Sequence, residues 1–117
     1  MGMALKEDVL EACTKAGTQK PIDLVHLSSV TMGDRALEAE VLAMFAAHID
    51  NYVAVAENCK NSDDVIRAAH TIKGSARSIG AFHLAKIAEM SENSGEFDLN
   101  ALKREFSRVD DYIAGLK

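Results

Sequence analysis

Residues 98–117 carry the pattern that most constrains how this chain can fold. Apolar residues recur there at intervals of three, four, three, four and three, which places them along one side of an α-helix. No stretch of the sequence shows the sustained alternation of apolar and polar residues that is typical of a half-buried strand. We therefore expect an all-α protein. The apolar seam of this last helix consists of Leu99, Leu102, Phe106, Val109, Ile113 and Leu116.

Residues suited to helix capping and to left-handed turns divide the preceding sequence into further helices. Asp34 and Asn61 can each accept hydrogen bonds from the free backbone N–H groups of a first helical turn. Gly80 and Gly95 can adopt the left-handed conformation that commonly ends a helix. The predicted helices run from Ile22 to Leu27, from Asp34 to about Cys59, from Asn61 to Ile79, from Leu84 towards Asn93 and from Asp98 to Leu116. On the longest, the predicted inward stripe is Leu37, Val41, Met44, Phe45, Ile49, Tyr52 and Val53.

The short loops between these helices favour antiparallel neighbours. We expect an antiparallel up-and-down four-helix bundle with one or two short extra helices at its N-terminal end. Residues 21–117 would form this domain. Residues 1–20 would be an N-terminal extension, either a short amphipathic helix or a flexible tail. A chain of 117 residues can bury one hydrophobic core but not two.

Charge, cysteine content and hydropathy exclude several classes of protein. The formal net charge of −5 argues against a nucleic-acid-binding protein, because such proteins need a basic surface. Cys13 and Cys59 match no metal-binding or redox spacing, and two thiols are too few to stabilise a small secreted fold. No apolar run approaches the roughly 18 residues of a membrane span. We expect a cytoplasmic, monomeric protein that binds other proteins and holds no metal ion.

The predicted helix from Asn61 to Ile79 presents one exposed histidine. Each residue advances a helix by about 100°, so His70 lies opposite the apolar stripe and faces water. Lys73, Gly74 and Arg77 all lie within about 60° of the direction of His70 on the helical wheel. The imidazole is therefore expected beside two cations and a missing side chain. The inward stripe consists of Val65, Ala68 or Ala69, Ile72, Ala76 and Ile79.

An imidazole flanked by cations is suited to receiving a phosphoryl group, because its lone pair can attack phosphorus while the cations offset the phosphate charge. For Arg77, a purely solvated position is the alternative. Glycine within a helix lowers its stability by about 1 kcal/mol relative to alanine. A glycine at position 74 is understandable despite this cost if the backbone of a partner protein approaches there. Close helix packing or a tolerated defect would also account for a glycine at this position. Ile66, four residues before His70, is expected on the same face and can serve docking.

The histidine segment resembles the histidine-containing phosphotransfer (HPt) domain. That family carries His-x-x-Lys-Gly-Ser or close variants on a four-helix bundle, and the similarity extends from about Pro21 to Leu116. The matching residues are His70-Thr71-Ile72-Lys73-Gly74-Ser75-Ala76, Ile79-Gly80-Ala81, Gly33-Asp34, Ala68-Ala69, Leu84, Ala85 and Glu92.

The resemblance implies a role for each matched position. The outer imidazole nitrogen of His70 would accept a phosphoryl group from an aspartyl phosphate on a receiver domain and pass it to the aspartate of another. Lys73 would offset the phosphate charge and Gly74 would admit the partner. Ser75 would tie its helix to a neighbour or bond near the ring. Glu92, if it reaches the inner nitrogen, would fix the tautomer that leaves the outer nitrogen free.

The resemblance also implies which partners supply the rest of the chemistry. The sequence has no glycine-rich nucleotide loop and no acidic cluster for Mg²⁺, so we expect neither ATP use nor a bound cofactor. The receiver domain would supply Mg²⁺, and a hybrid sensor histidine kinase would act upstream. The alternatives are the phosphoacceptor domain of a chemotaxis-type kinase and a helical module that binds receivers without being phosphorylated. The expected docking residues are Met32, Ile66, Ala69, Lys73, Gly74 and Arg77.

Overall fold

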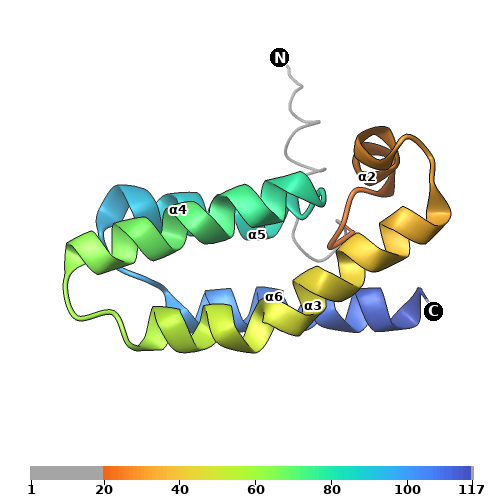
Figure 1. Ribbon diagram of the computed structural model, residues 1–117. Helices are drawn as coiled ribbons and strands as arrows, with labels where there is room; N and C mark the ends of the chain where they lie inside the picture. The colour runs from red at the N-terminus through yellow and green to blue at the C-terminus, as the bar shows by residue number, and fades with distance from the viewer. Residues whose placement is uncertain (1–19, 117) are drawn as a thin grey trace, which may run out of the picture.

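The computed structural model describes residues 20–116, which form five α-helices (Figure 1). This part of the chain contains no strand, so the all-α prediction is confirmed. The helix predicted within the N-terminal extension lies outside the described residues. The helices are α2 (Leu24–Thr31), α3 (Arg35–Glu57), α4 (Ser62–Ser78), α5 (Phe82–Ser94) and α6 (Leu99–Gly115).

The predicted caps account for where the longer helices begin and end. The Asp34 carboxylate accepts from the backbone N–H of Leu37 at 3.0 Å, and the Asn61 side chain accepts from the backbone N–H of Asp64 at 2.9 Å. Each contact satisfies a donor that the first helical turn leaves free. Gly80 and Gly95 have φ angles of 82° and 78°, so both adopt the left-handed conformation expected of helix terminators.

The first described helix, α2, does not have the bounds Ile22–Leu27 that the sequence predicts. It starts at Leu24, because the side chain of Asp23 caps it by accepting from the backbone N–H groups of Val25 and His26. It then continues to Thr31 and ends in a left-handed residue, Met32, with a φ of 57°. The prediction ended this helix too early because the apolar run stops at Leu27, whereas the left-handed turn that follows the helix is made by Met32 and Gly33.

The four longer helices contact one another in a closed cycle. α3 contacts α4 and α6, and α5 contacts the same two helices, while α2 packs on α3. Figure 1 shows α4 and α5 side by side as one pair, with α3 and α6 as the other. Apolar side chains from these helices and from the segment around α2 form one core, in which the largest fully buried ones are Ile22, Leu27, Ile72, Ile79, Leu84, Leu102, Phe106 and Val109.

The apolar stripe predicted for the longest helix is wrong in part. Met44 is 62% exposed and Leu37 is also exposed, whereas Leu42 and Ala56, which were not in the stripe, are buried. The reason is that α3 contacts α2, α4 and α6 along its length. A helix with three neighbours buries different sides at different points, so no single stripe describes it.

The segment before α2 is fixed to the turn between α4 and α5. The backbone N–H of Asp23 donates to the carbonyl oxygen of Gly80 at 2.8 Å. Gly80 leaves no room there for a side chain, because a Cβ atom would lie 2.7 Å from the carbonyl oxygen of Asp23. Ile22 and Leu27, on either side of this contact, are completely buried. Ile22 and Leu27 therefore belong to the hydrophobic core, and the segment that carries them is not an appendage to it.

Candidate functional site

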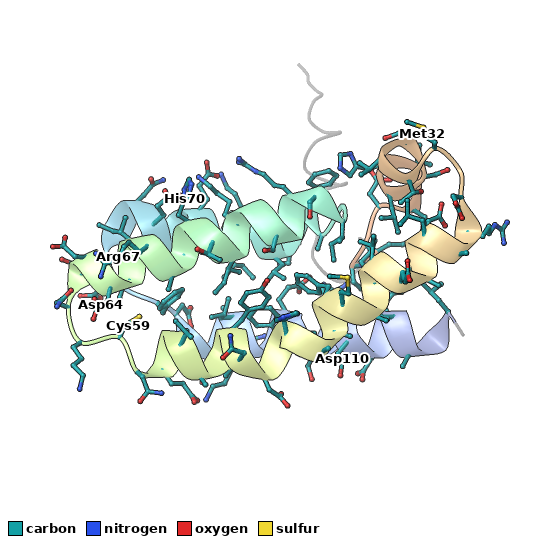
Figure 2. All side chains as sticks on the ribbon, viewed as in Figure 1. Met32, Cys59, Asp64, Arg67, His70 and Asp110 are labelled. Carbon is teal, nitrogen blue, oxygen red and sulfur yellow. The ribbon has the colours of Figure 1, made fainter. Side chains whose placement is uncertain are left out.

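His70 projects outward from the middle of α4. Val65, Ala69, Ile72 and Ala76 on the same helix are buried, which turns the opposite side of α4 to solvent. The His70 side chain is 70% exposed, and Figure 2 shows it pointing away from the helices. The exposure predicted from helical spacing is confirmed.

Glu92 on α5 reaches the inner nitrogen of the His70 ring. Its Oε2 lies 2.9 Å from Nδ1. An ionised carboxylate can only accept a hydrogen bond, so Nδ1 must carry the proton of this contact. In the neutral ring the lone pair is then on Nε2, the nitrogen farther from the backbone. The arrangement thus leaves a nucleophilic nitrogen at the outer edge of an exposed side chain.

Lys73 contacts the same carboxyl group as His70, and its side chain is turned towards α5. Its side chain is only 16% exposed, and Nζ lies 2.6 Å from Oε1 of Glu92. The sequence predicts Lys73 beside the imidazole, and in the structure its charge is paired with the same carboxylate that contacts the ring. A helical wheel gives the direction in which a side chain leaves the backbone, but α5 supplies the anion that decides where the long lysine stem ends.

Glu92 carries a negative charge at neutral pH. The contact with Lys73 and then the hydrogen bond that Nδ1 of His70 donates lower the pKa of the Glu92 carboxyl below its ordinary value, with a smaller opposing effect of desolvation. The carboxylate therefore holds two groups through its two oxygens, the imidazole through Oε2 and the ammonium through Oε1.

Two arginines extend the charged surface of α4 on either side of His70. Arg77 is 53% exposed, and its guanidinium lies 3.7 Å from Glu89 of α5. Arg67, one turn before His70, is 74% exposed and forms a 2.9 Å ion pair with Asp64. Arg77 was predicted from the sequence, whereas Arg67 was missed, although its spacing of three residues from His70 was available as a signal.

Gly74 lies one turn after His70 on the exposed side of α4. A Cβ atom built there would have no heavy atom within 4 Å, leaving aside the helix's own nearby backbone. Close packing against another helix is therefore wrong as the reason for this glycine. The space beside the imidazole is open to an approaching molecule.

The other predicted site residues are not all brought together. The Ser75 hydroxyl accepts a hydrogen bond from the hydroxyl of Tyr52 at 3.0 Å, which ties α4 to α3. Ala69 is completely buried in the inward stripe, so its prediction as a docking residue is wrong. Ile66 is 38% exposed, whereas Met32 is 92% exposed at the end of α2. Figure 2 shows Met32 at the far end of the molecule from Asp64, well away from His70.

Within residues 20–116 no group of three or more His, Cys, Asp or Glu side chains is arranged to hold a metal ion. None of the helices described here is both long enough and apolar enough to cross a membrane.

An all-helical domain with an exposed imidazole, a carboxylate on its inner nitrogen and a neighbouring lysine defines a class of protein that handles phosphoryl groups on histidine. The family model described as Hpt domain matches residues 34–117, which is most of the chain. The chain belongs to the Hpt domain family, whose members carry out histidine phosphotransfer in the phosphorelays of two-component systems. No curated protein and no solved structure matches the chain.

Proposed function

We propose that this protein is a phosphorelay intermediate that accepts a phosphoryl group on Nε2 of His70. The donor would be the aspartyl phosphate of one receiver domain and the acceptor the aspartate of another. The observation that carries the proposal is the hydrogen bond between Glu92 and Nδ1, because it assigns the lone pair to the exposed nitrogen. The Nε2 lone pair would form the N–P bond as the electron pair of the P–O bond leaves with the aspartate oxygen.

The neighbouring residues suit this chemistry in different ways. Lys73 contacts the same carboxylate as the ring and would offset the charge of a phosphoryl group on Nε2, and the exposed guanidinium of Arg77 would be a second cation on the same helix. Gly74 leaves room for the backbone of the receiver domain, and Ile66 offers it an apolar contact. Met32 would contribute only to a partner large enough to reach α2.

The remaining parts of the reaction would come from partners. We propose that residues 21–117 form an antiparallel up-and-down four-helix bundle that holds the imidazole rigidly and binds no cofactor. The receiver domain would supply the phosphoaspartate and its Mg²⁺, and an upstream hybrid sensor histidine kinase would supply the phosphoryl group from ATP. The protein would act in the cytoplasm as a monomer.

The test is phosphotransfer from a receiver domain carrying ³²P-labelled phosphoaspartate. We expect acid-labile label on the wild type and none on His70→Gln. His48→Gln is the matched control, because His48 is also exposed but lies on α3, where its Nδ1 contacts the carbonyl oxygen of Met44. Equal labelling of His70→Gln would overturn the assignment of the residue. Labelling by an ATP-bound kinase domain but by no receiver would instead favour the phosphoacceptor domain of a chemotaxis-type kinase.

A further inference from the structure

One carboxylate engages both side chains that flank the reactive nitrogen. Oε2 of Glu92 contacts Nδ1 of His70 at 2.9 Å, and Oε1 contacts Nζ of Lys73 at 2.6 Å. Lys73 is mostly buried in this arrangement. Without a phosphoryl group, its positive charge is thus directed at Glu92 and not at the solvent beside Nε2.

A phosphoryl group on Nε2 would be a second anion within reach of Lys73. His70 and Lys73 contact the same carboxyl group, so Nζ and the ring are separated by no more than one carboxyl group, one hydrogen bond and one ion pair. The four-carbon stem of lysine rotates freely enough for Nζ to move between neighbouring anions. A phosphoryl group carries more negative charge than a carboxylate and has three acceptor oxygens.

We propose that Glu92 is a positioning residue that competes with the phosphoryl group for Lys73, and that this competition destabilises the phosphohistidine and keeps transfer reversible. The inference rests on the proposed function of His70. When the N–P bond forms, Nζ moves from Oε1 of Glu92 to a phosphoryl oxygen. Oε2 keeps its contact with the Nδ1 proton, so no proton is transferred in the step.

The two contacts of Glu92 have opposite effects on the phosphorylated state. The contact with Lys73 favours the free protein, because it must be broken when the phosphoryl group arrives. The contact with Nδ1 favours the phosphorylated protein, because attack through Nε2 leaves positive charge on the ring, which the carboxylate stabilises. Removing the charge of Glu92 therefore raises the phosphorylated fraction if competition dominates and lowers it if the ring contact dominates.

The experiment uses phosphoramidate, a donor that needs no partner protein and whose protonated nitrogen leaves as ammonia with the electron pair of the P–N bond. The ratio of phosphorylated to free protein is measured by ³¹P NMR at fixed phosphoramidate and ammonium concentrations. We expect Glu92→Gln to raise this ratio about fivefold. In a Lys73→Met background the same substitution should produce no increase.

Glu57→Gln is the matched control, because it removes the same charge from α3, where the carboxylate pairs with Lys103 of α6 instead. It should leave the ratio unchanged. A second readout is the ¹³C NMR titration of the Glu92 carboxyl carbon. On phosphorylation its pKa should shift upward relative to the shift measured in Lys73→Met, because only the wild type loses the contact with Lys73 that lowers it.

A ratio that is unchanged or lowered in Glu92→Gln overturns the inference, as does an equal increase in the Lys73→Met background. If folded wild-type protein forms no phosphohistidine, either from phosphoramidate or from a phosphorylated receiver domain, the proposed function itself fails. The two failures are thus distinguishable.

Discussion

The carboxylate of Glu92 on α5 accepts a hydrogen bond from Nδ1 of His70 on α4, across 22 residues of sequence. Because α4 and α5 lie side by side and are joined by the turn at Gly80, the contact depends on the register of the two helices. A change that shifts one helix against the other would separate the ring from its acceptor without altering either residue.

Gly74→Ala should make the folded protein more stable but slow phosphotransfer. Alanine is the better helix former and meets no atom of this chain, so the free energy of unfolding should rise by about 0.4–1 kcal/mol. The new methyl group should obstruct a receiver domain and slow phosphotransfer about tenfold. Urea denaturation and initial rates of transfer measure the two effects. Gly115→Ala is the control, because that site is also open but lies at the end of α6. Unchanged transfer by Gly74→Ala would mean that the glycine is a tolerated defect of the helix.

Gly80→Ala should have the opposite effect on stability. The residue has a φ of 82°, and its Cβ would meet the carbonyl oxygen of Asp23 at 2.7 Å. We expect the free energy of unfolding to fall by about 1–3 kcal/mol, because both the backbone conformation and the contact become unfavourable. Chemical denaturation monitored by circular dichroism checks this. A variant as stable as the wild type would contradict the tight contact between this turn and residue 23.

Tyr52→Phe tests whether Ser75 serves the fold. Losing the hydrogen bond to Ser75 should lower the free energy of unfolding by about 1 kcal/mol and leave transfer unchanged. Ser75→Ala should have a similar cost, and the double variant should cost less than the sum of the two. Stability by urea titration and transfer rates would be measured for all three proteins. Slower transfer by Ser75→Ala alone would indicate a role near the ring.

Stability should depend on Glu92 at acid pH. The folded protein holds the pKa of this carboxyl below its ordinary value of 4.5, so the unfolded chain binds the proton more readily. The resulting stabilisation is fully present above about pH 4.5, the ordinary pKa of the carboxyl, and is lost as the pH falls through the lower pKa of the folded state. Glu92→Gln should therefore flatten the dependence of the free energy of unfolding on pH in that acid range. A pH profile as steep as that of the wild type would contradict the shift.

Arg77→Gln should distinguish a phosphate-facing cation from a solvated residue. The exposed guanidinium has only a 3.7 Å contact with Glu89, so the free energy of unfolding should change by less than about 0.5 kcal/mol. If Arg77 serves the anionic donor, transfer slows severalfold at low salt and the difference narrows as salt is added. Equal transfer rates at every ionic strength would assign Arg77 to the solvated surface.

Local signals predicted the parts of this molecule that depend on neighbouring residues in sequence. The caps at Asp34 and Asn61 and the exposure of His70 follow from side-chain chemistry and helical periodicity, which act within one or two turns. The position of Lys73 could not be predicted in this way, since it is set by an anion on α5. The buried faces of α3 were missed because its three neighbours, α2, α4 and α6, cover different sides of it, which periodicity within one helix does not reveal.

The contact of Asp23 with Gly80 bears on how this protein can be shortened or fused to others. The family match starts at residue 34, yet Ile22 and Leu27, both with no exposed surface, precede it. A truncation at residue 34 would remove these two buried side chains from the hydrophobic core. The remaining helices would then have to repack to fill the cavities. A domain boundary taken from the family match would thus remove part of the hydrophobic core. A recombinant version should retain the residues from Lys20 onward.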